Sequence, residues 1–240
     1  MGMVHGPNLV TDGLQFYIDP SNVQCYPGSG STIYDLSGNG RDATMYLYQS
    51  SGNKTTSGHG ITVSGGWFNF PTSNHFSFIS LPSSTIAGLT AFTMEFWIYP
   101  SSITSNINTL VSSGAANNFL WYINSTTNIT YSNQGCGSGG VSFDFTAANN
   151  LFTLVRSSST IQTYRNTVAK GSIADSIALT VPGTFGEFVV GQEYDSNANG
   201  DFEIVQSWLG KIGPIRIYNR ALSTAELTQN YNAHKSRYGL

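Results

Sequence analysis

The stretch that decides the fold is Phe92-Thr93-Met94-Glu95-Phe96-Trp97-Ile98-Tyr99, which Pro100 follows. Successive side chains of a β-strand point to opposite faces of its sheet. One face of this strand is therefore apolar, with Phe92, Met94, Phe96 and Ile98. The opposite face carries Thr93, Glu95, Trp97 and Tyr99. Proline cannot donate to the strand ladder, so we expect the strand to end at Pro100.

Similar short runs recur along the chain, separated by glycine, asparagine, serine and proline. No helical segment lies between them, which argues against a parallel sheet built from βαβ units. The pattern predicts an all-β fold, a two-sheet antiparallel jelly-roll sandwich. In the last strand, Pro214 predicts an edge or a bulge. The other predicted strands are 14–18, 67–70, 76–81, 119–123, 129–132, 141–145, 151–156, 161–165, 185–191 and 208–218.

The sequence predicts one short helix, at the C-terminus. Ser223-Thr224-Ala225-Glu226 has the capping-box pattern, in which serine and glutamate satisfy the first free amides of a helix. Gly239 can end the segment. The stripe that we expect to dock on the sandwich carries Leu227, Tyr231 and His234.

Composition excludes several classes of protein. The 240 residues are 40% hydrophobic and only 10% charged, with a net charge of −3. A disordered chain would be charged and poor in aromatic residues, and a nucleic-acid-binding surface would be basic. No apolar run is long enough to cross a membrane. We expect no nucleic-acid or membrane partner.

The chain is predicted to form one domain over residues 13–240, preceded by an N-terminal arm over residues 1–12. Met1 to Val10 lacks the charged and apolar regions of a secretion signal. We therefore expect this arm to be flexible or pinned to a neighbour. Two cysteines, Cys25 and Cys136, lie in glycine-rich loops, and the sequence leaves open whether they are bonded, although free thiols are favoured.

The two ends of the chain and its central strand together resemble a known family. The segments that carry the resemblance are 13–19 (GLQFYID), 26–31 (YPGSGS), 34–40 (YDLSGNG), 92–100, 210–223 (GKIGPIRIYNRALS) and 232–240 (NAHKSRYGL). They are similar to LamG-like, concanavalin A-like jelly-roll domains, in the form common among virion proteins of tailed bacteriophages. The resemblance spans the chain in order and is specific for the fold.

The resemblance implies a non-enzymatic structural protein of a phage virion: a capsid decoration, a head fibre or a tail-associated module, such as part of a tail fibre. Its partners would be other virion proteins and further copies of itself. It would be located in the virion, which is assembled in the host cytoplasm. The alternative is a carbohydrate-binding adhesin that recognises host surface glycans. A glycan-cleaving enzyme is the third reading, because one fold serves many functions.

Catalytic chemistry has little support in the sequence. Glycan hydrolysis needs two carboxylates about 5–10 Å apart across the scissile bond. Glu95 stands alone in its strand, and Glu193-Tyr194-Asp195 leads into a polar loop rather than an apolar strand. The histidines have no ligand spacing, so we expect each to be a surface or hydrogen-bonded group. We predict that the chain is not an enzyme.

Calcium is the cofactor that the sequence suggests, at two places. One loop resembles the first half of an EF-hand calcium loop, although Gln206 replaces the closing glutamate and Glu203 would have to substitute for it. The alternative for this loop is a polar hairpin turn. The second place is Asp35 with Asn39, near Asp19, because LamG-like domains often hold calcium at their rim. The predicted ligands of the first loop are Asp195, Asn197, Asn199, Asp201 and Glu203.

Glycan binding would use exposed aromatic rings that stack on sugar faces. Two pairs of aromatic residues suit this role, one on the polar face of the central strand and one beside asparagine-rich loops. In a sandwich, such rings also serve in the core or at subunit interfaces. The candidates are Trp97, Tyr99, Trp121 and Tyr122.

Overall fold

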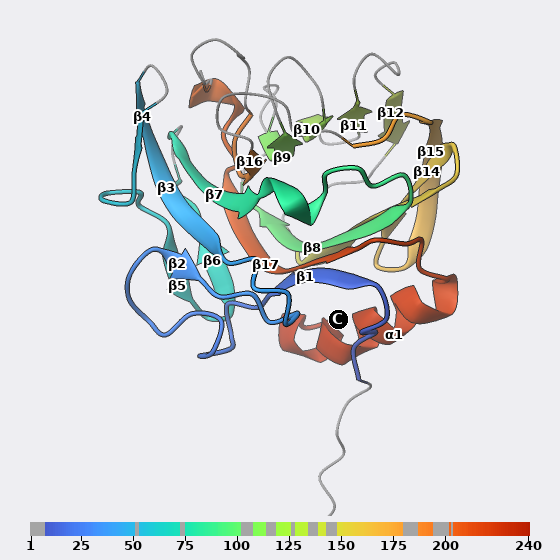
Figure 1. The fold of residues 1–240 in the computed structure, drawn as a ribbon, viewed down its shortest axis with the longest axis horizontal. Coiled ribbons are helices and arrows are strands. Elements are labelled where there is room, and N and C mark those ends of the chain that lie inside the picture. The colour runs from blue at the N-terminus through green and yellow to red at the C-terminus, as the bar shows by residue number, and fades with distance from the viewer. Residues whose placement is uncertain are drawn as a thin grey trace, which may run out of the picture.

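The computed structural model describes residues 8–50, 53–72, 75–101, 108–113, 119–125, 128–133, 139–142, 148–179, 187–193, 202 and 204–240. Two antiparallel sheets face each other, and one short helix lies against the outer side of the first (Figure 1). The predicted all-β sandwich with a C-terminal helix is confirmed. No helix of the described part is long and apolar enough to span a bilayer.

The first sheet has eight strands within the described residues, ordered β15-β14-β13-β8-β17-β6-β5, and β1 pairs with β17 outside this path. The last long strand, β17, therefore lies between the central strand β8 and the strand β6, both of which come much earlier in the sequence. The strands of this sheet are β1 (Leu14–Ile18), β5 (Thr62–Ser64), β6 (Trp67–Asn69), β8 (Phe92–Pro100), β13 (Asn150–Ser157), β14 (Thr160–Arg165), β15 (Val168–Ala174) and β17 (Gly210–Tyr218).

The second sheet has nine strands within the described residues, ordered β12-β11-β10-β9-β16-β7-β3-β2, and β4 pairs with β3 outside this path. Three short 3-10 helices complete the described elements: η1 (Ser83–Thr85), η2 (Ile204–Gln206) and η3 (Lys235–Tyr238). The strands of this sheet are β2 (Thr32–Ile33), β3 (Ala43–Ser50), β4 (Asn53–Thr55), β7 (Ser77–Pro82), β9 (Asn108–Ser113), β10 (Phe119–Ser125), β11 (Asn128–Ser132), β12 (Gly139–Ser142) and β16 (Glu187–Val190).

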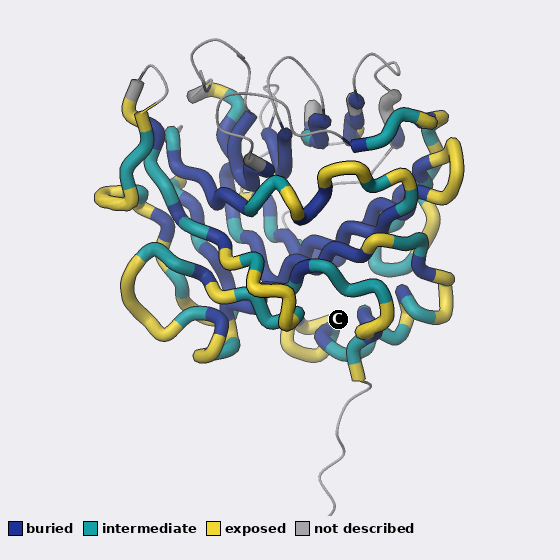
Figure 2. The backbone as a smooth tube through the Cα atoms, in the orientation of Figure 1, coloured by how far each residue is buried: buried dark blue, intermediate teal, exposed yellow. Residues whose placement is uncertain are grey.

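The core fills the space between the sheets (Figure 2). Alternation places the apolar face of β8 inward, as predicted, and its side chains are fully buried there. Aromatic rings from the two sheets meet edge to face. The Phe96 ring lies 5.7 Å from that of Trp121, with an interplanar angle of 73°.

Pro214 lies at a bulge in β17, as predicted. The register between β17 and β8 shifts between Ile212 and Ile215. On the other side of β17, the pairing with β6 includes Ile212, and the pairing with β1 begins at Ile215. Pro214 falls in the interval where neither neighbour has a registered partner, so its missing N–H breaks no ladder bond.

The C-terminal helix α1 (Thr224–His234) begins as the sequence predicts. The Ser223 hydroxyl accepts from the amide of Glu226, and the Glu226 carboxylate accepts from the amide of Ser223 at 2.8 Å. The segment continues into η3 and ends at Gly239, whose φ of 71° is left-handed. Leu227 and His234 are buried, and the Tyr231 ring stacks on Trp97, so the predicted stripe docks on the sandwich.

Candidate functional site

Helix α1 and η3 cover the outer face of the first sheet with two small apolar clusters. One cluster lies under the start of the helix and packs Leu222 and Leu227 against Val10, Val155 and Tyr218. The other lies under η3, where the Tyr238 ring stacks on Trp97 at 4.4 Å and meets Trp67 at 4.6 Å with the two rings tilted by 59°. Between the two clusters the same interface is polar.

Glu95 and Arg216 form the centre of that polar strip. The two residues are register partners on β8 and β17, and Arg216 Nε lies 2.7 Å from Glu95 Oε2 with both side chains fully buried. Burial raises the pKa of Glu95 against the pull of Arg216, whereas the Glu95 carboxylate outweighs burial and raises the pKa of Arg216. Asn230 of the helix also donates to Glu95 Oε2, at 2.9 Å.

His234 connects this ion pair to the edge of the sheet. Its Nδ1 lies 2.8 Å from Arg216 Nη1, and its Nε2 lies 3.7 Å from Asp19 Oδ2. Burial and the charges of Arg216 and Arg237 lower the pKa of His234 to about 3. The imidazole is therefore neutral at neutral pH, with Nδ1 accepting from Arg216 and the proton on Nε2, toward Asp19.

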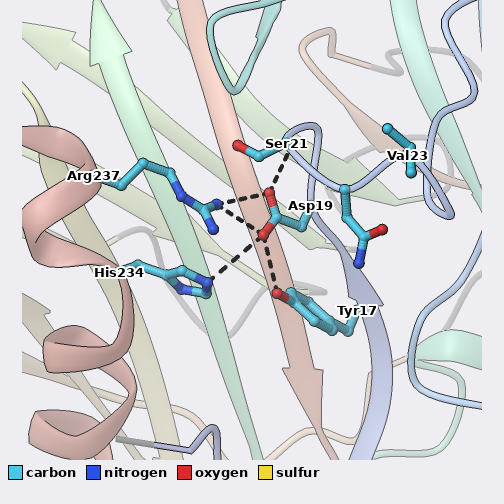
Figure 3. Close-up of a pocket in the computed structure, with 7 residues that line it drawn as sticks. Tyr17, Asp19, Ser21, Val23, His234 and Arg237 are labelled. Carbon is cyan, nitrogen blue, oxygen red and sulfur yellow. Dashed lines mark hydrogen bonds and ion pairs between the residues drawn. The ribbon is translucent and has the colours of Figure 1, made fainter. Parts of the chain in front are cut away.

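Asp19 follows β1 and accepts four hydrogen bonds, in addition to the longer contact with His234 (Figure 3). Arg237 Nη1 donates to Oδ1 at 2.9 Å and to Oδ2 at 2.8 Å. The amide of Ser21 donates to Oδ1 at 2.9 Å, and the Tyr17 hydroxyl to Oδ2 at 3.2 Å. Burial alone would raise the pKa of Asp19, but Arg237 and the Ser21 amide outweigh it and hold that pKa below its usual value.

A pocket of about 450 Å³ opens beside this carboxylate. One wall is the turn after β1, closed by the amide of Asn22 donating to the Asp19 carbonyl oxygen at 2.9 Å. The opposite wall is the end of the helical segment, with His234 and Arg237 (Figure 3). We call it the rim pocket, lined by Tyr17, Asp19, Ser21, Asn22, Val23, His234 and Arg237.

The rim pocket can bind polar groups but is poorly equipped for hydrolysis. Asp19 is the one carboxylate among its described lining residues. With two donors on each oxygen and a lowered pKa, that carboxylate stays ionised and cannot supply a proton. A glycosidase needs a second carboxylate across the bond, and Glu95 is fully buried beneath the helix.

Two of the predicted sugar-stacking residues are in the wrong place for that role. Trp97 and Trp121 are both fully buried. Trp97 does lie on the outer face of β8, but Tyr231 and Tyr238 cover it. Trp121 points into the core, 4.0 Å from the ring of Phe152. Neither indole can stack on a sugar in this structure, so the prediction is corrected for both.

Tyr99 and Tyr122 are half-buried and lie on different sheets, on β8 and β10. Lys211 Nζ lies 5.4 Å from the centre of the Tyr99 ring. The structure does not bring either tyrosine into the rim pocket. Sugar stacking on these two rings stays a prediction.

Asp35 and Asn39, the second predicted calcium pair, organise a turn. Asp35 accepts from the amides of Tyr17, Ser37 and Arg41 and from the Ser37 hydroxyl, at 2.7–3.1 Å. Asn39 donates to the carbonyl oxygens of residues 14 and 15. Within the described ranges no group of three or more histidine, cysteine or acidic residues could hold a metal. Calcium at Asp35 stays a prediction.

The first predicted calcium loop lies outside the described residues, at Asp195, Asn197, Asn199, Asp201 and Glu203. Cys136 lies outside them as well, while Cys25 is a buried free thiol whose sulfur accepts from the Asp19 amide at 3.2 Å. His75 is hydrogen-bonded, as predicted: Nδ1 accepts from the Ser77 amide, and Nε2 lies 3.0 Å from the Trp208 carbonyl oxygen.

Sequence reasoning missed Arg237 as a site residue and noted Asp19 only as part of the family signature and as a neighbour of the predicted calcium pair Asp35 and Asn39. The two residues are 218 positions apart, so no local spacing links them. The available signal was indirect, because both lie in the segments that carry the family resemblance.

The fold and the helix-covered sheet define a lectin-like jelly roll, and sequence comparison names the family. A model described as "Concanavalin A-like lectin/glucanases superfamily" matches residues 71–228, more than half of the chain. The chain therefore belongs to this superfamily. No curated protein matches the sequence.

Solved structures show the same fold at low sequence identity. Domain 4 of AbnA, a GH43 arabinanase from Geobacillus stearothermophilus in complex with arabinotriose, is 16% identical with a TM-score of 0.62, and the match covers 91% of this chain and 98% of that one. The binding domain of botulinum neurotoxin serotype D/C is 14% identical with a TM-score of 0.62, over 93% of this chain and 52% of that one.

A sialidase from Trypanosoma rangeli, in complex with the inhibitor DANA, is 11% identical with a TM-score of 0.61. That match covers 98% of this chain but only 36% of the sialidase. The chain thus spans about a third of the sialidase and half of the toxin domain. These similarities extend to the fold alone.

Proposed function

We propose that this domain binds carbohydrate and does not cleave it. The observation that carries the proposal is the rim pocket, where hydrogen-bonding side chains surround one carboxylate that is already saturated with donors. Such a site can hold a hydroxyl-rich molecule by hydrogen bonds. Its described lining residues include no acid and base pair that would break a glycosidic bond.

The size and chemistry of the pocket suit a small saccharide. Its volume of about 450 Å³ falls within the usual range for small-molecule sites. The Arg237 side chain is 36% exposed, and its guanidinium carries further N–H donors beyond the Nη1 that holds Asp19. Ser21 adds a hydroxyl, and Val23, which is 78% exposed, adds an apolar contact at the mouth.

The structural neighbours support the same ligand class without deciding it. The arabinanase domain, which this fold matches over 98% of its length, is in complex with arabinotriose, and the sialidase with the inhibitor DANA. Those ligands belong to those proteins. Their relevance here is that one domain of this fold, matched over nearly its whole length, is in complex with a saccharide.

A structural role in a phage virion remains the sequence-based alternative. It follows from the resemblance of both chain ends to LamG-like virion proteins, and it is compatible with glycan binding if the domain faces outward on a particle. Its partners would be other virion proteins and further copies of this chain. Mass spectrometry of purified virions tests this role, and absence of the chain from the particles would reject it.

Carbohydrate binding is tested with the full chain on a glycan array, followed by calorimetry with the free form of a bound glycan. We expect Ser21→Ala and Val23→Ala each to weaken binding about three- to tenfold, the size of one lost hydrogen bond or apolar contact. Val168→Ala is the matched control, because Val168 is 59% exposed on β15 and outside the pocket. Chromatography of the same mixtures should show no cleavage products.

Two outcomes would reject this proposed function. The first is the absence of binding to every glycan on the array. The second is release of shortened saccharides by the wild-type chain at a rate that Asp19→Asn abolishes. The same titrations, repeated with and without calcium, test whether binding needs the ion.

A further inference from the structure

The charges around the rim pocket cancel in pairs. Arg237 is matched by Asp19, whose Oδ2 lies 2.8 Å from Nη1. Deeper in the same strip, Arg216 is matched by Glu95. His234 lies between the two pairs and contributes no charge, because its Nδ1 accepts a hydrogen bond from Arg216. The described side chains that face the pocket therefore sum to zero charge.

We propose that Asp19 makes the rim pocket selective for neutral saccharides over saccharides that carry a carboxylate. Asp19 acts through Arg237, as a positioning residue, and not by touching the ligand. The inference rests on the proposed function, since it assigns the class of saccharide that the same pocket takes.

The physical reason is competition for one guanidinium. A carboxylate on a ligand would seek the bidentate arrangement that arginine offers to anions. Asp19 already holds Nη1 with both of its oxygens. The Asp19 side chain is only 5% exposed, so losing Arg237 would leave a buried, unpaired charge, which is strongly unfavourable. Hydroxyl groups can instead accept from the remaining arginine donors without disturbing the pair.

Positioning by Asp19 also explains its other contacts. The Tyr17 hydroxyl and the Ser21 amide fix the carboxylate from the side of β1, while Arg237 approaches from η3. The guanidinium is thus held between two elements that meet only in the folded chain. Its orientation in the pocket is set before any ligand arrives, which lowers the ordering cost of binding.

The test uses the full chain on an array printed with neutral glycans and their α2,3-sialylated counterparts. The readout is the ratio of sialylated to neutral signal for each matched pair. We expect the wild type to favour the neutral member. Asp19→Asn should raise the ratio on the order of tenfold, the effect of one unit charge at a partly solvated site. The asparagine retains an oxygen for the Ser21 amide.

A second variant keeps the test decisive if Asp19→Asn folds poorly. Val23→Lys adds one positive charge at the mouth of the pocket, at a position exposed enough to leave the fold intact. It should raise the same ratio severalfold, and more at low salt than at high salt. Val168→Lys adds the same charge on β15, away from the pocket, and should leave the ratio unchanged.

The outcomes separate this inference from the proposed function. Glycan binding with a ratio that neither variant changes would overturn the inference and leave the proposed function standing. A wild type that favours the sialylated members would do the same. If the role of Asp19 were purely structural, Asp19→Asn would weaken binding of the neutral and the sialylated glycan of each pair equally, and this result too would overturn the inference. Failure to bind any glycan would overturn both proposals.

Discussion

Replacing Trp97 with alanine should destabilise the domain rather than remove a sugar-binding surface. The indole is fully buried on the outer face of β8, where it stacks on Tyr231 at 5.8 Å and 9° and on Tyr238 at 4.4 Å and 27°. Gly213 leaves the room for this packing, since an added Cβ there would lie 3.0 Å from the Trp97 Cβ atom.

The magnitude follows from the complete burial of the indole that the variant removes. Truncating a buried tryptophan to alanine costs about 3–5 kcal/mol in free energy of unfolding. For a domain of this length each kcal/mol lowers Tm by about 2–4 °C. We therefore expect Tm to fall by about 10 °C, with early loss of the near-ultraviolet circular dichroism signal as the helix detaches.

The assay is thermal and urea unfolding, followed by near-ultraviolet circular dichroism, of the wild type and Trp97→Ala. Tyr34→Ala is the control, because Tyr34 is 45% exposed and its loss should change stability by less than about 0.5 kcal/mol. If Trp97→Ala unfolded like the wild type but lost glycan binding, the indole would be a surface platform, and the covering role of α1 and η3 would be refuted.

Three further perturbations test the same interface. Asn230→Ala leaves the buried Val10 amide without its 2.9 Å acceptor and should cost about 2 kcal/mol, with loss of amide-exchange protection at Val10. Glu226→Gln should remove a pH-dependent contribution to stability, because Arg220 holds the pKa of Glu226 near 2, below its usual 4.5. Gly213→Ala should weaken docking of η3, because the new Cβ would lie 2.8 Å from the Tyr238 hydroxyl; tryptophan fluorescence reports this change.

The pH prediction has a definite sign. A carboxyl group whose pKa is lowered on folding stabilises the protein above its unfolded pKa, and the contribution disappears as pH falls toward the folded pKa. The difference in unfolding free energy between wild type and Glu226→Gln should therefore shrink between about pH 4.5 and 2. A difference that stays constant over this window would contradict it. For Asn230, protection at Val10 equal to that of wild type would contradict the role given to its amide.

The strands that sequence could predict are those whose inner and outer faces differ in polarity. The alternation in Phe92–Pro100 identified the inner face of β8 correctly, because period two is a property of the strand itself. The burial of its outer face could not be read from the same residues. It depends on α1 and η3, which lie more than a hundred residues later and cover Trp97.

Other strands escaped prediction because polarity did not mark them. β9 (Asn108–Ser113) is buried throughout although its ends are polar, so hydrophobicity gave no signal. β15 (Val168–Ala174) is a largely exposed edge strand in which Ile173 alone packs against the core, too little apolar surface to mark a strand. β3 (Ala43–Ser50) has Met45 facing the core but Tyr46 and Tyr48 in an apolar cluster on the outside, which blurs the alternation.

The rim pocket could not be predicted, because its key pair joins the two ends of the chain. Asp19 follows the first strand and Arg237 lies in η3, and nothing in the sequence around either residue indicates that the other is its partner. Glu95 illustrates the same limit. It is a lone acidic residue in its strand by sequence, and its partners Arg216 and Asn230 come from β17 and α1.

The most direct test of the account is to map a bound glycan on the full chain by NMR. A neutral glycan that binds on the array would be titrated into isotope-labelled protein, and the amide shifts followed residue by residue. The account predicts the largest changes at the amides of the residues that line the rim pocket, which are Tyr17, Asp19, Ser21, Asn22, Val23, His234 and Arg237. Changes confined to the outer face of the second sheet, or none at saturating glycan, would contradict it.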